Sequence, residues 1–327
     1  MTRAVISAIE YYLPAQVLTN EALATEFPEW NADKIAEKTG INARHIAGEK
    51  ELSSDLAVNA ARKLFAVAGV APEQIDFVLL CTQTPDFALP TTACLVQHRL
   101  GVPCSAGAVD YNLGCSGYIY GLSLAKGLIE TGQAKRVLLL TAETYSKLID
   151  RQDKTVRTIF GDAGAATLIS AVDGSAEYIG PFAFGTDGSG GANLVCHRGG
   201  FRGPTAEAAG REALFMNGPE IFNFTLRAVP DVVRRLTQAA TIPIEAIDLF
   251  VFHQANRFMM EHLRKKLNVP LEKFVVALES FGNTVSCTIP IALSEARRAG
   301  NLKPGMLVML VGFGVGYSWG ATLVRWE

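Results

Sequence analysis

The stretch Ala106-Gly-Ala-Val-Asp-Tyr-Asn-Leu-Gly-Cys-Ser-Gly-Tyr-Ile-Tyr-Gly-Leu-Ser-Leu-Ala-Lys126 joins a strand-like run to an apparent helix, and Cys115 lies at the junction. A thiol at this point faces unpaired N–H groups and the positive end of the helix dipole, which favour thiolate over thiol. Of the six cysteines, only Cys115 has this setting. The stretch predicts a nucleophile for acyl transfer, although a small buried core residue would also explain this cysteine.

The composition is that of an ordinary globular protein of enzyme size. The chain has 327 residues, 49% hydrophobic and 19% charged, which is enough for a large core and two packed halves. Thirty Lys and Arg against 32 Asp and Glu give a formal charge of -2. The charge balance therefore predicts neither nucleic acid nor a membrane surface as a partner.

The N-terminal segment and the cysteine pattern predict a cytoplasmic protein. The first residues lack the apolar core and cleavage site of a secretory signal, and the apolar stretch from Met306 to Gly316 is too short to span a bilayer. The cysteines are unclustered and show no CxxC spacing. We therefore expect reduced thiols, without a disulfide framework and without a metal site.

Strand-like apolar runs alternate with helix-like segments, a pattern typical of an α/β protein with buried, mostly parallel strands. The expected strands are Phe77–Leu80, Val137–Leu140, Leu249–Phe252 and Leu307–Val311. The expected helices are Ser54–Val67, Gly121–Glu130 and Pro290–Arg298.

These segments repeat at an almost fixed offset, which indicates a duplicated domain. The pair Ile75-Asp76 returns as Ile247-Asp248, 172 positions later, and the pair Leu122-Ser123 returns after 171 positions. The expected division is into two related halves, residues 1–172 and residues 173–327, because Asp and Gly break the pattern between them.

Under this offset the second half supplies partners for the nucleophile. Cys115 corresponds to Ser286, which puts Asn283 in the counterpart of the nucleophile turn. His253 ends the first clear strand of the second half, and loops at strand ends form the sites of many α/β proteins. A satisfied histidine and a turn asparagine would explain each residue separately. Their pairing by the repeat favours a Cys–His–Asn site.

A series of short motifs is spread over essentially the whole chain. They are Lys38-Thr-Gly-Ile41 with Arg44-His-Ile46, Asn112-Leu-Gly-Cys-Ser-Gly117, Phe160-Gly-Asp-Ala-Gly-Ala165, His253-Gln-Ala-Asn256, Gly282-Asn-Thr284 and Gly312-Phe-Gly-Val-Gly-Tyr-Ser-Trp-Gly320. Together they resemble the β-ketoacyl-acyl-carrier-protein synthase III family of the thiolase fold. The resemblance implies a thiolase-like α/β fold, with two pseudo-symmetric halves in a five-layered α-β-α-β-α core, and a homodimer.

The resemblance also implies an acyltransferase of fatty-acid biosynthesis. Cys115 would attack an acyl thioester, with backbone N–H groups of Cys115 and Val315 holding the oxyanion. A malonyl thioester would then lose CO2 while His253 and Asn283 hydrogen-bond the enolate, whose carbon attacks the acyl group. The substrates expected are acyl-CoA or acyl carrier protein as donor and malonyl-ACP or malonyl-CoA as extender, with no bound cofactor.

Further residues are assigned to the substrate pocket by the same resemblance, namely Leu89, Phe87 and Phe313. Leu89 occupies the place of a phenylalanine that, in the well-studied bacterial enzymes, reaches across the dimer and shortens the acyl pocket. A smaller residue there would admit longer or branched acyl groups. The Gly- and Ala-rich segment from Thr186 to Arg211 is expected to shape the entrance.

Basic residues are assigned to coenzyme A or carrier binding. Lys34 stands where those enzymes carry a tryptophan that stacks on adenine, and Lys154 stands where an arginine is usual. A lysine holds a phosphate as a point charge but does not stack, which favours a carrier-protein donor. A cluster after His253 is either a solvated face or a docking patch for an acidic carrier: Arg257, Arg264, Lys265 and Lys266.

Two other functions fit the same residues. One is an acyltransferase that moves the acyl group to an alcohol or amine of a specialised metabolite. The other is a noncatalytic partner subunit of a condensing heterodimer. Release of CO2 from a malonyl thioester would separate condensation from acyl transfer, and acylation of Cys115 would separate both from a noncatalytic subunit.

Overall fold

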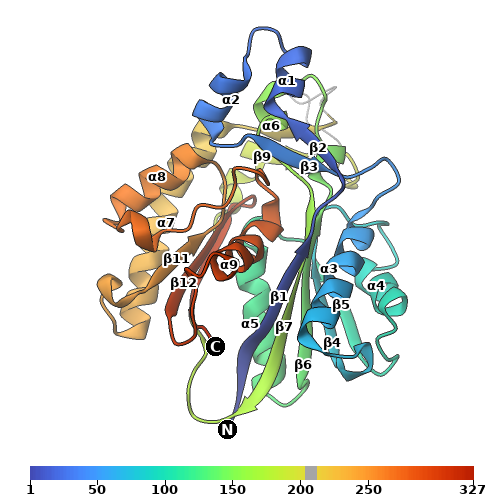
Figure 1. The fold of residues 1–327 in the computed structure, drawn as a ribbon, viewed down its shortest axis with the longest axis vertical. Coiled ribbons are helices and arrows are strands. Elements are labelled where there is room, and N and C mark those ends of the chain that lie inside the picture. The colour runs from blue at the N-terminus through green and yellow to red at the C-terminus, as the bar shows by residue number, and fades with distance from the viewer. Residues whose placement is uncertain (203–211) are drawn as a thin grey trace.

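Two mixed β-sheets, with helices between them and on both outer sides, form the fold (Figure 1). The computed structural model describes residues 1–202 and 212–327. One sheet has five strands in the order β1-β7-β6-β4-β5, and the other has four in the order β11-β12-β13-β8. Of the segment from Thr186 to Arg211, residues 203–211 lie outside the described residues.

The elements of the described residues have the following bounds. The strands are β1 (Thr2–Tyr12), β2 (Gln16–Thr19), β3 (Ala43–Ile46), β4 (Phe77–Cys81), β5 (Gly107–Tyr111), β6 (Arg136–Glu143), β7 (Ala163–Asp173), β8 (Ile179–Thr186), β9 (Leu194–Cys196), β10 (Leu214–Met216), β11 (Leu249–Phe252), β12 (Leu307–Gly314) and β13 (Ser318–Arg325). The α-helices are α1 (Asn20–Glu26), α2 (Ala32–Thr39), α3 (Ser53–Ala68), α4 (Thr92–Leu100), α5 (Gly117–Glu130), α6 (Lys154–Arg157), α7 (Gly218–Ala240), α8 (Arg257–Lys266) and α9 (Thr288–Arg298).

The layers follow the order helix, sheet, helix, sheet, helix. Helices α3 and α4 cover the outer face of the five-stranded sheet, α5 and α9 lie between the sheets, and α7 with α8 covers the far face of the second sheet (Figure 1). This is the five-layered thiolase-like α/β core that the resemblance predicted. Strands buried on both faces explain why β6 is almost continuously apolar.

The two sheets share one pattern of strand pairing. β4 runs parallel to β6 and β11 runs parallel to β12, while β7 and β13 each continue their sheet in antiparallel fashion. Phe77 faces Val137 in the first sheet, and Leu249 faces Val308 in the second. The pairing matches the predicted repeat offset. The division of the chain between residues 172 and 173 stays a prediction.

The expected strands and helices are confirmed, with differences at their ends. The strand-like run that was expected to reach the junction at Cys115 ends at Tyr111, because residues 112–116 leave the sheet and turn into α5. The thiol of Cys81 donates to the carbonyl of Leu113 at 2.8 Å, and the N–H of Gly117 donates to Gly114 at 2.8 Å. These bonds hold the turn that carries the predicted nucleophile.

Helix α5 joins the two sheets through a fully buried apolar surface. Ile119 and Leu122 belong to a core that includes residues of both sheets, and each such side chain contributes about 1.5–3 kcal/mol when buried. Gly121 lets the helix approach the first sheet, since a Cβ there would lie 2.2 Å from the hydroxyl of Tyr111. Among the described residues no helix is both long and apolar enough to cross a membrane.

Candidate active site

Cys115 lies in the turn between β5 and α5, close to the end of β12. Its side chain is buried, with 6% of the residue exposed. A Cβ added to Gly314 would lie 3.0 Å from the Cys115 sulfur, and one added to Gly312 would lie 2.8 Å from the Cys115 carbonyl oxygen. The glycines of this motif therefore let β12 pass directly against the nucleophile turn.

Burial decides the protonation state of this thiol. It raises the pKa of Cys115 to about 12, and the carboxyl group of Glu143 acts in the same direction. This differs from the expectation that the helix start would favour the thiolate. The physical reason is desolvation, which exceeds the effect of the helix end. The thiol of Cys115 is therefore neutral near pH 7.

His253 follows β11 and is held at two points. Its backbone N–H donates to the carbonyl of Val311 at 2.8 Å, and its ring Nδ1 lies 2.7 Å from the hydroxyl oxygen of Thr288. Burial lowers the pKa of His253 to about 3. The imidazole is therefore neutral near pH 7. It packs edge-to-face with the ring of Phe313, with the ring centroids 5.4 Å apart and the planes at 83°.

Asn283 is fixed by its backbone, which leaves its amide nitrogen available. Its N–H donates to Ile159 at 2.9 Å and its carbonyl accepts from Gly161 at 3.0 Å. Its side-chain oxygen accepts from the N–H of Val285 at 2.9 Å. Within the described part of the chain, no hydrogen bond uses the Asn283 Nδ2 donor. Gly282, at φ 68, makes the preceding turn possible because its Cβ would lie 2.7 Å from the Ile159 carbonyl.

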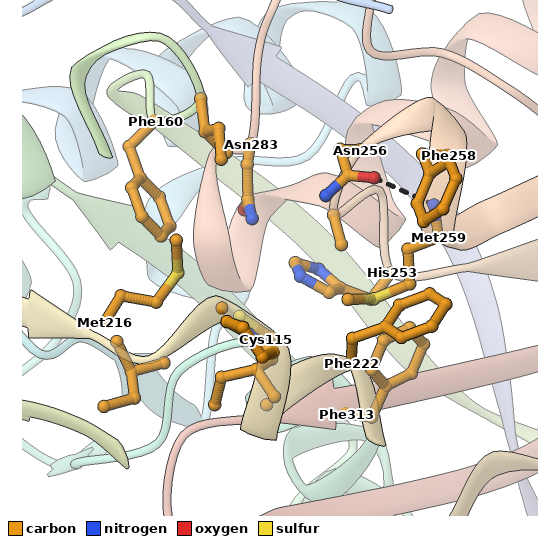
Figure 2. Close-up of a pocket in the computed structure, with 17 residues that line it drawn as sticks. Cys115, Phe160, Met216, Phe222, His253, Asn256, Phe258, Met259, Asn283 and Phe313 are labelled. Carbon is orange, nitrogen blue, oxygen red and sulfur yellow. Dashed lines mark hydrogen bonds between the residues drawn. The ribbon is translucent and has the colours of Figure 1, made fainter. Parts of the chain in front are cut away.

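A single cavity of about 390 Å³ brings Cys115, His253 and Asn283 together. Figure 2 shows the three side chains on its wall, with the amide of Asn283 and the imidazole of His253 directed into it. The rest of the wall is mainly apolar. It includes Phe160, Met216, Phe222, Phe258, Met259 and Phe313. Such a wall suits an uncharged acyl chain and excludes water from the reacting groups.

The two backbone donors expected for the oxyanion lack an oxygen acceptor among the described residues. Considering residues 1–202 and 212–327, no oxygen accepts a hydrogen bond from the N–H of Cys115 or from the N–H of Val315. Val315 lies in the turn between β12 and β13, and its side chain faces Gly114. These are the two donors expected for the oxyanion.

Of the three residues predicted to line the substrate pocket, one lines the cavity and two do not. Phe313 lines the cavity and contacts His253. Phe87 is 57% exposed and Leu89 is 82% exposed, both on the loop between β4 and α4, and neither lines the cavity of the single chain. An effect of Phe87 and Leu89 on acyl length would therefore need a partner subunit.

Lys34 and Lys154 both lie near one half-buried tryptophan, Trp30. Their ammonium groups are 5.8 Å and 5.9 Å from the centroid of the Trp30 ring, and that of Lys38 is 5.0 Å away. Lys154 also forms an ion pair with Glu29. This cluster was not predicted from the sequence, although Trp30 stands only four residues before Lys34.

The basic cluster on α8 is largely engaged within the chain. Arg257 lies 3.6 Å from Glu279, Arg264 lies 2.9 Å from Glu261, and Lys266 donates to the carbonyl of Leu226 at 2.8 Å. Lys265 is exposed on the same helix. Three of the four basic side chains thus have partners within the chain, which is typical of an ordinary solvated helix surface. The docking of a carrier protein on this helix stays a prediction.

Two polar residues near the site were not predicted from the sequence. Thr288 begins α9 and contacts His253, and Glu143 ends β6 at full burial. A carboxyl group that closes an otherwise apolar strand is a usable signal, because such groups are rarely buried without a role. For Thr288 the sequence contains no comparable signal.

Comparisons with known proteins agree with this architecture. The family model described as 3-Oxoacyl-[acyl-carrier-protein (ACP)] synthase III matches residues 109–188, and its C-terminal counterpart matches residues 237–326. A β-ketoacyl-[acyl-carrier-protein] synthase III of Erythrobacter litoralis is 39% identical over 331 residues, covering 100% of both chains.

Solved structures are similar over the same length. A crystal structure of a 3-oxoacyl-(acyl-carrier-protein) synthase III superposes with a TM-score of 0.97 at 54% identity, covering 99% of this chain and 100% of the other. A 3-oxoacyl-(acyl-carrier-protein) synthase of Burkholderia xenovorans LB400 gives a TM-score of 0.94 at 37% identity, covering 100% of this chain and 95% of the other. The chain therefore belongs to the β-ketoacyl-[acyl-carrier-protein] synthase III family of thiolase-like condensing enzymes, and is an acyltransferase of that type.

Proposed function

We propose that this enzyme loads an acyl group on Cys115 and condenses it with a malonyl thioester, using His253 and Asn283 as donors to the enolate. The observation that carries this proposal is that all three side chains lie on the wall of one apolar cavity. A thiol, a neutral imidazole and a free carboxamide are the groups that the two half-reactions need.

In the first half-reaction the Cys115 sulfur attacks the carbonyl carbon of an acyl thioester. The new C–S bond forms as the carbonyl oxygen becomes an oxyanion, which accepts from the free N–H groups of Cys115 and Val315. The bond to the carrier sulfur then breaks. Because the resting thiol is neutral, its proton leaves during the attack and ends on the departing carrier thiol, so the acyl-enzyme forms without a change in net charge.

In the second half-reaction a malonyl thioester replaces the carrier thiol and loses CO2. The electron pair released forms an enolate, whose oxygen accepts from Asn283 Nδ2–H and from the Nε2–H of neutral His253. The enolate carbon attacks the acyl carbonyl, the C–S bond to Cys115 breaks, and the β-ketoacyl thioester leaves. The negative charge passes to the Cys115 sulfur, which takes a proton from water to restore the neutral thiol. Loss of one such donor typically costs about 3 kcal/mol, or roughly a hundredfold in rate.

A neutral imidazole carries a single ring proton, so it donates from Nε2 only when Nδ1 is unprotonated. In that tautomer the hydroxyl of Thr288 donates to Nδ1, across the 2.7 Å contact. In the other tautomer Nδ1–H donates to Thr288, whose hydroxyl donates to the carbonyl of Val285 at 3.0 Å. Reaction therefore uses the first arrangement, and a low pKa keeps the ring neutral in both.

The proposal also covers the substrates of the enzyme, its oligomeric partner and its location in the cell. We infer an acyl-CoA or acyl-carrier-protein donor and a malonyl-ACP or malonyl-CoA extender, since the names of the relatives contain an acyl carrier protein. We further infer a cytoplasmic homodimer in which Leu89 and Phe87 reach the partner's cavity. Two related halves, 1–172 and 173–327, would bring Cys115 from one half and His253 with Asn283 from the other.

The test separates the proposed reaction from its alternatives. The enzyme is incubated with a panel of acyl-CoA and acyl-ACP thioesters, and intact mass reports the group retained on Cys115, with Cys115→Ser as the control. Malonyl-ACP labelled in the free carboxyl group is then added and released CO2 is counted. Acylation without CO2 release would favour transfer to an alcohol or amine, and no acylation would favour a noncatalytic subunit.

A further inference from the structure

Glu143 is a buried carboxyl group that the reaction described above does not use. It ends β6 and is 0% exposed. One oxygen accepts from the backbone N–H of Gln83 at 3.0 Å and from the hydroxyl of Thr84 at 3.2 Å, and the other accepts from the hydroxyl of Ser286 at 2.8 Å. In the described part of the chain no cation pairs with it. A buried acid without a cation needs an explanation.

Gln83, whose backbone N–H donates to Glu143, also contacts the turn that carries Cys115. The side chain of Gln83 donates to Asn112 at 3.1 Å and accepts from the hydroxyl of Tyr145 at 2.6 Å. A Cβ added to Gly114 would lie only 2.5 Å from the side-chain oxygen of Gln83. Gln83 is therefore packed against the residue before Cys115.

Ser286, whose hydroxyl donates to the other oxygen of Glu143, lies in the turn that carries Asn283. Ser286 belongs to the short 3-10 helix Val285–Cys287, directly after Asn283 and Thr284. Val285 has a φ of 57, which is strained for a β-branched residue, and its N–H holds the Asn283 side-chain oxygen. A strained turn keeps its shape only when its surroundings fix it. The bond from Ser286 to Glu143 is such a fixing contact.

The predicted repeat relates this contact to one at the nucleophile. Residues 171 positions after Cys115 and Glu143 are Ser286 and Gly314. Gly314 lies directly against Cys115, and Glu143 bonds to Ser286. Gly314 and Glu143 therefore occupy equivalent positions in the two halves. The second half has a glycine there, which contacts Cys115, and the first half has a carboxyl group, which bonds to Ser286 in the turn after Asn283.

We propose that Glu143 is a positioning residue for condensation, and that it acts as the neutral carboxylic acid, holding the Asn283 turn and the Gln83 loop at a fixed separation across the cavity. The proposal rests on the condensing reaction proposed above. It assigns Glu143 no contact with substrate.

The surroundings favour the neutral acid. Burial raises the pKa of Glu143 to about 8, against the opposing effect of its hydrogen-bond donors. The titratable groups that face it are acids: Cys81, Cys115, Tyr111, Tyr145, Asp162 and Cys287. The acid proton has an acceptor in the hydroxyl of Thr84, which in turn reaches the hydroxyl of Ser53 at 2.7 Å. A carboxylate here would instead oppose the negative charge of the Cys115 thiolate and of the enolate.

The test compares Glu143→Gln with Glu143→Ala. The carboxamide is neutral at every pH. With its oxygen toward Gln83 and Thr84 and its NH2 group toward the Ser286 hydroxyl, it keeps every contact of the acid, with the donor and acceptor roles at Thr84 and Ser286 exchanged. Alanine removes both contacts. Acylation of Cys115 is followed by intact mass, and condensation of pre-acylated enzyme with malonyl-ACP is followed by product formation between pH 6 and 9.5.

For Glu143→Gln we expect condensation within about threefold of wild type at pH 7. Wild type should lose condensation as the pH rises through about 8, because the active neutral form titrates away, whereas Glu143→Gln should lack this fall. For Glu143→Ala we expect at least a thirtyfold loss of condensation and no more than a fivefold loss of acylation. Glu10→Gln, another buried glutamate, paired with Lys63, Arg297 and Arg298, is the control. It should leave the pH profile and the ratio of the half-reactions unchanged.

Two results would overturn the proposal. One is an alkaline fall that persists unchanged in Glu143→Gln, and the other is an equal loss of both half-reactions in the alanine variant. If Glu143→Ala does not fold, the pH profile of Glu143→Gln decides alone. Absence of condensation in wild type would overturn the proposed function as well, whereas a wild type that condenses without any effect of Glu143 would overturn the positioning role only.

Discussion

The ring Nδ1 of His253 lies 2.7 Å from the hydroxyl of Thr288, the first residue of α9. The same hydroxyl is 3.0 Å from the carbonyl of Val285, so it has one proton and two acceptors to choose from. The choice sets which ring nitrogen of His253 carries hydrogen. Thr288 thereby connects the turn after Asn283 to the protonation pattern of the imidazole.

Thr288→Val is expected to slow condensation about tenfold while acylation stays within about threefold. Valine keeps the shape but cannot donate to Nδ1, so the Nε2–H tautomer loses a hydrogen bond worth about 1–1.5 kcal/mol. The measurement is the rate of each half-reaction under single-turnover conditions. Thr288→Ser restores the hydroxyl and should return condensation to near wild type; equal rates in the valine and serine variants would contradict the tautomer argument.

The fold was predictable because its signals are local and repeated. Continuous apolar runs at Val137–Leu140 and Leu307–Val311 indicated buried strands, and the constant offset between the halves indicated their equivalence. The ends of elements were less predictable. The strand leading to Cys115 ends at Tyr111 because the Cys81 thiol and other side chains hold the turn, and such long-range bonds leave no periodic trace.

The positions of the site residues were predictable in part, because the repeat between the two halves relates them. Cys115, His253 and Asn283 stand at the ends of strands or turns that the repeat relates, so topology alone brings them to one cavity. The pKa values of these side chains depend on how deeply each one is buried, and the sequence pattern does not give the depth of burial. The helix start beside Cys115 suggested a lowered pKa, yet desolvation raises the pKa of the thiol to about 12. The roles of Phe87 and Leu89 stay predictions, because they lie outside the cavity of one chain.

Asn283→Ala is expected to reduce condensation roughly a hundredfold, since it removes one of the two donors proposed for the enolate oxygen. Acylation should stay within about fivefold, because the proposed mechanism assigns the oxyanion of that step to backbone N–H groups. Both rates are measured as for Thr288. Asn59→Ala, the same change on α3 in the outer helix layer, is the matched control and should leave both rates unchanged.

Gly314→Ala is expected to abolish acylation of Cys115 or reduce it at least a hundredfold. The added methyl group would lie 3.0 Å from the sulfur and 2.9 Å from the Cys115 Cβ, closer than real Cβ contacts allow. Intact mass after exposure to acyl-CoA measures the loss. Gly127→Ala, on α5 with nothing within 4 Å of the new Cβ, should stabilise the protein by about 0.5–1 kcal/mol and leave acylation unchanged. Full acylation of Gly314→Ala would mean that β12 moves away from the turn.

Stability should fall as the pH is lowered below 6.5, in part because of His253. Burial lowers its pKa to about 3, whereas the unfolded chain keeps the ordinary value of 6.5, so between these values the unfolded state binds the extra proton. The free energy of unfolding therefore rises with pH across this window, by up to about 1.4 kcal/mol per pH unit for this group. Urea unfolding of wild type and of His253→Gln at pH 5 and pH 7 measures the effect. The loss of stability from pH 7 to pH 5 should be smaller in His253→Gln by about 2 kcal/mol. Equal losses would mean that the imidazole of His253 takes up its proton in the folded protein as readily as in the unfolded chain.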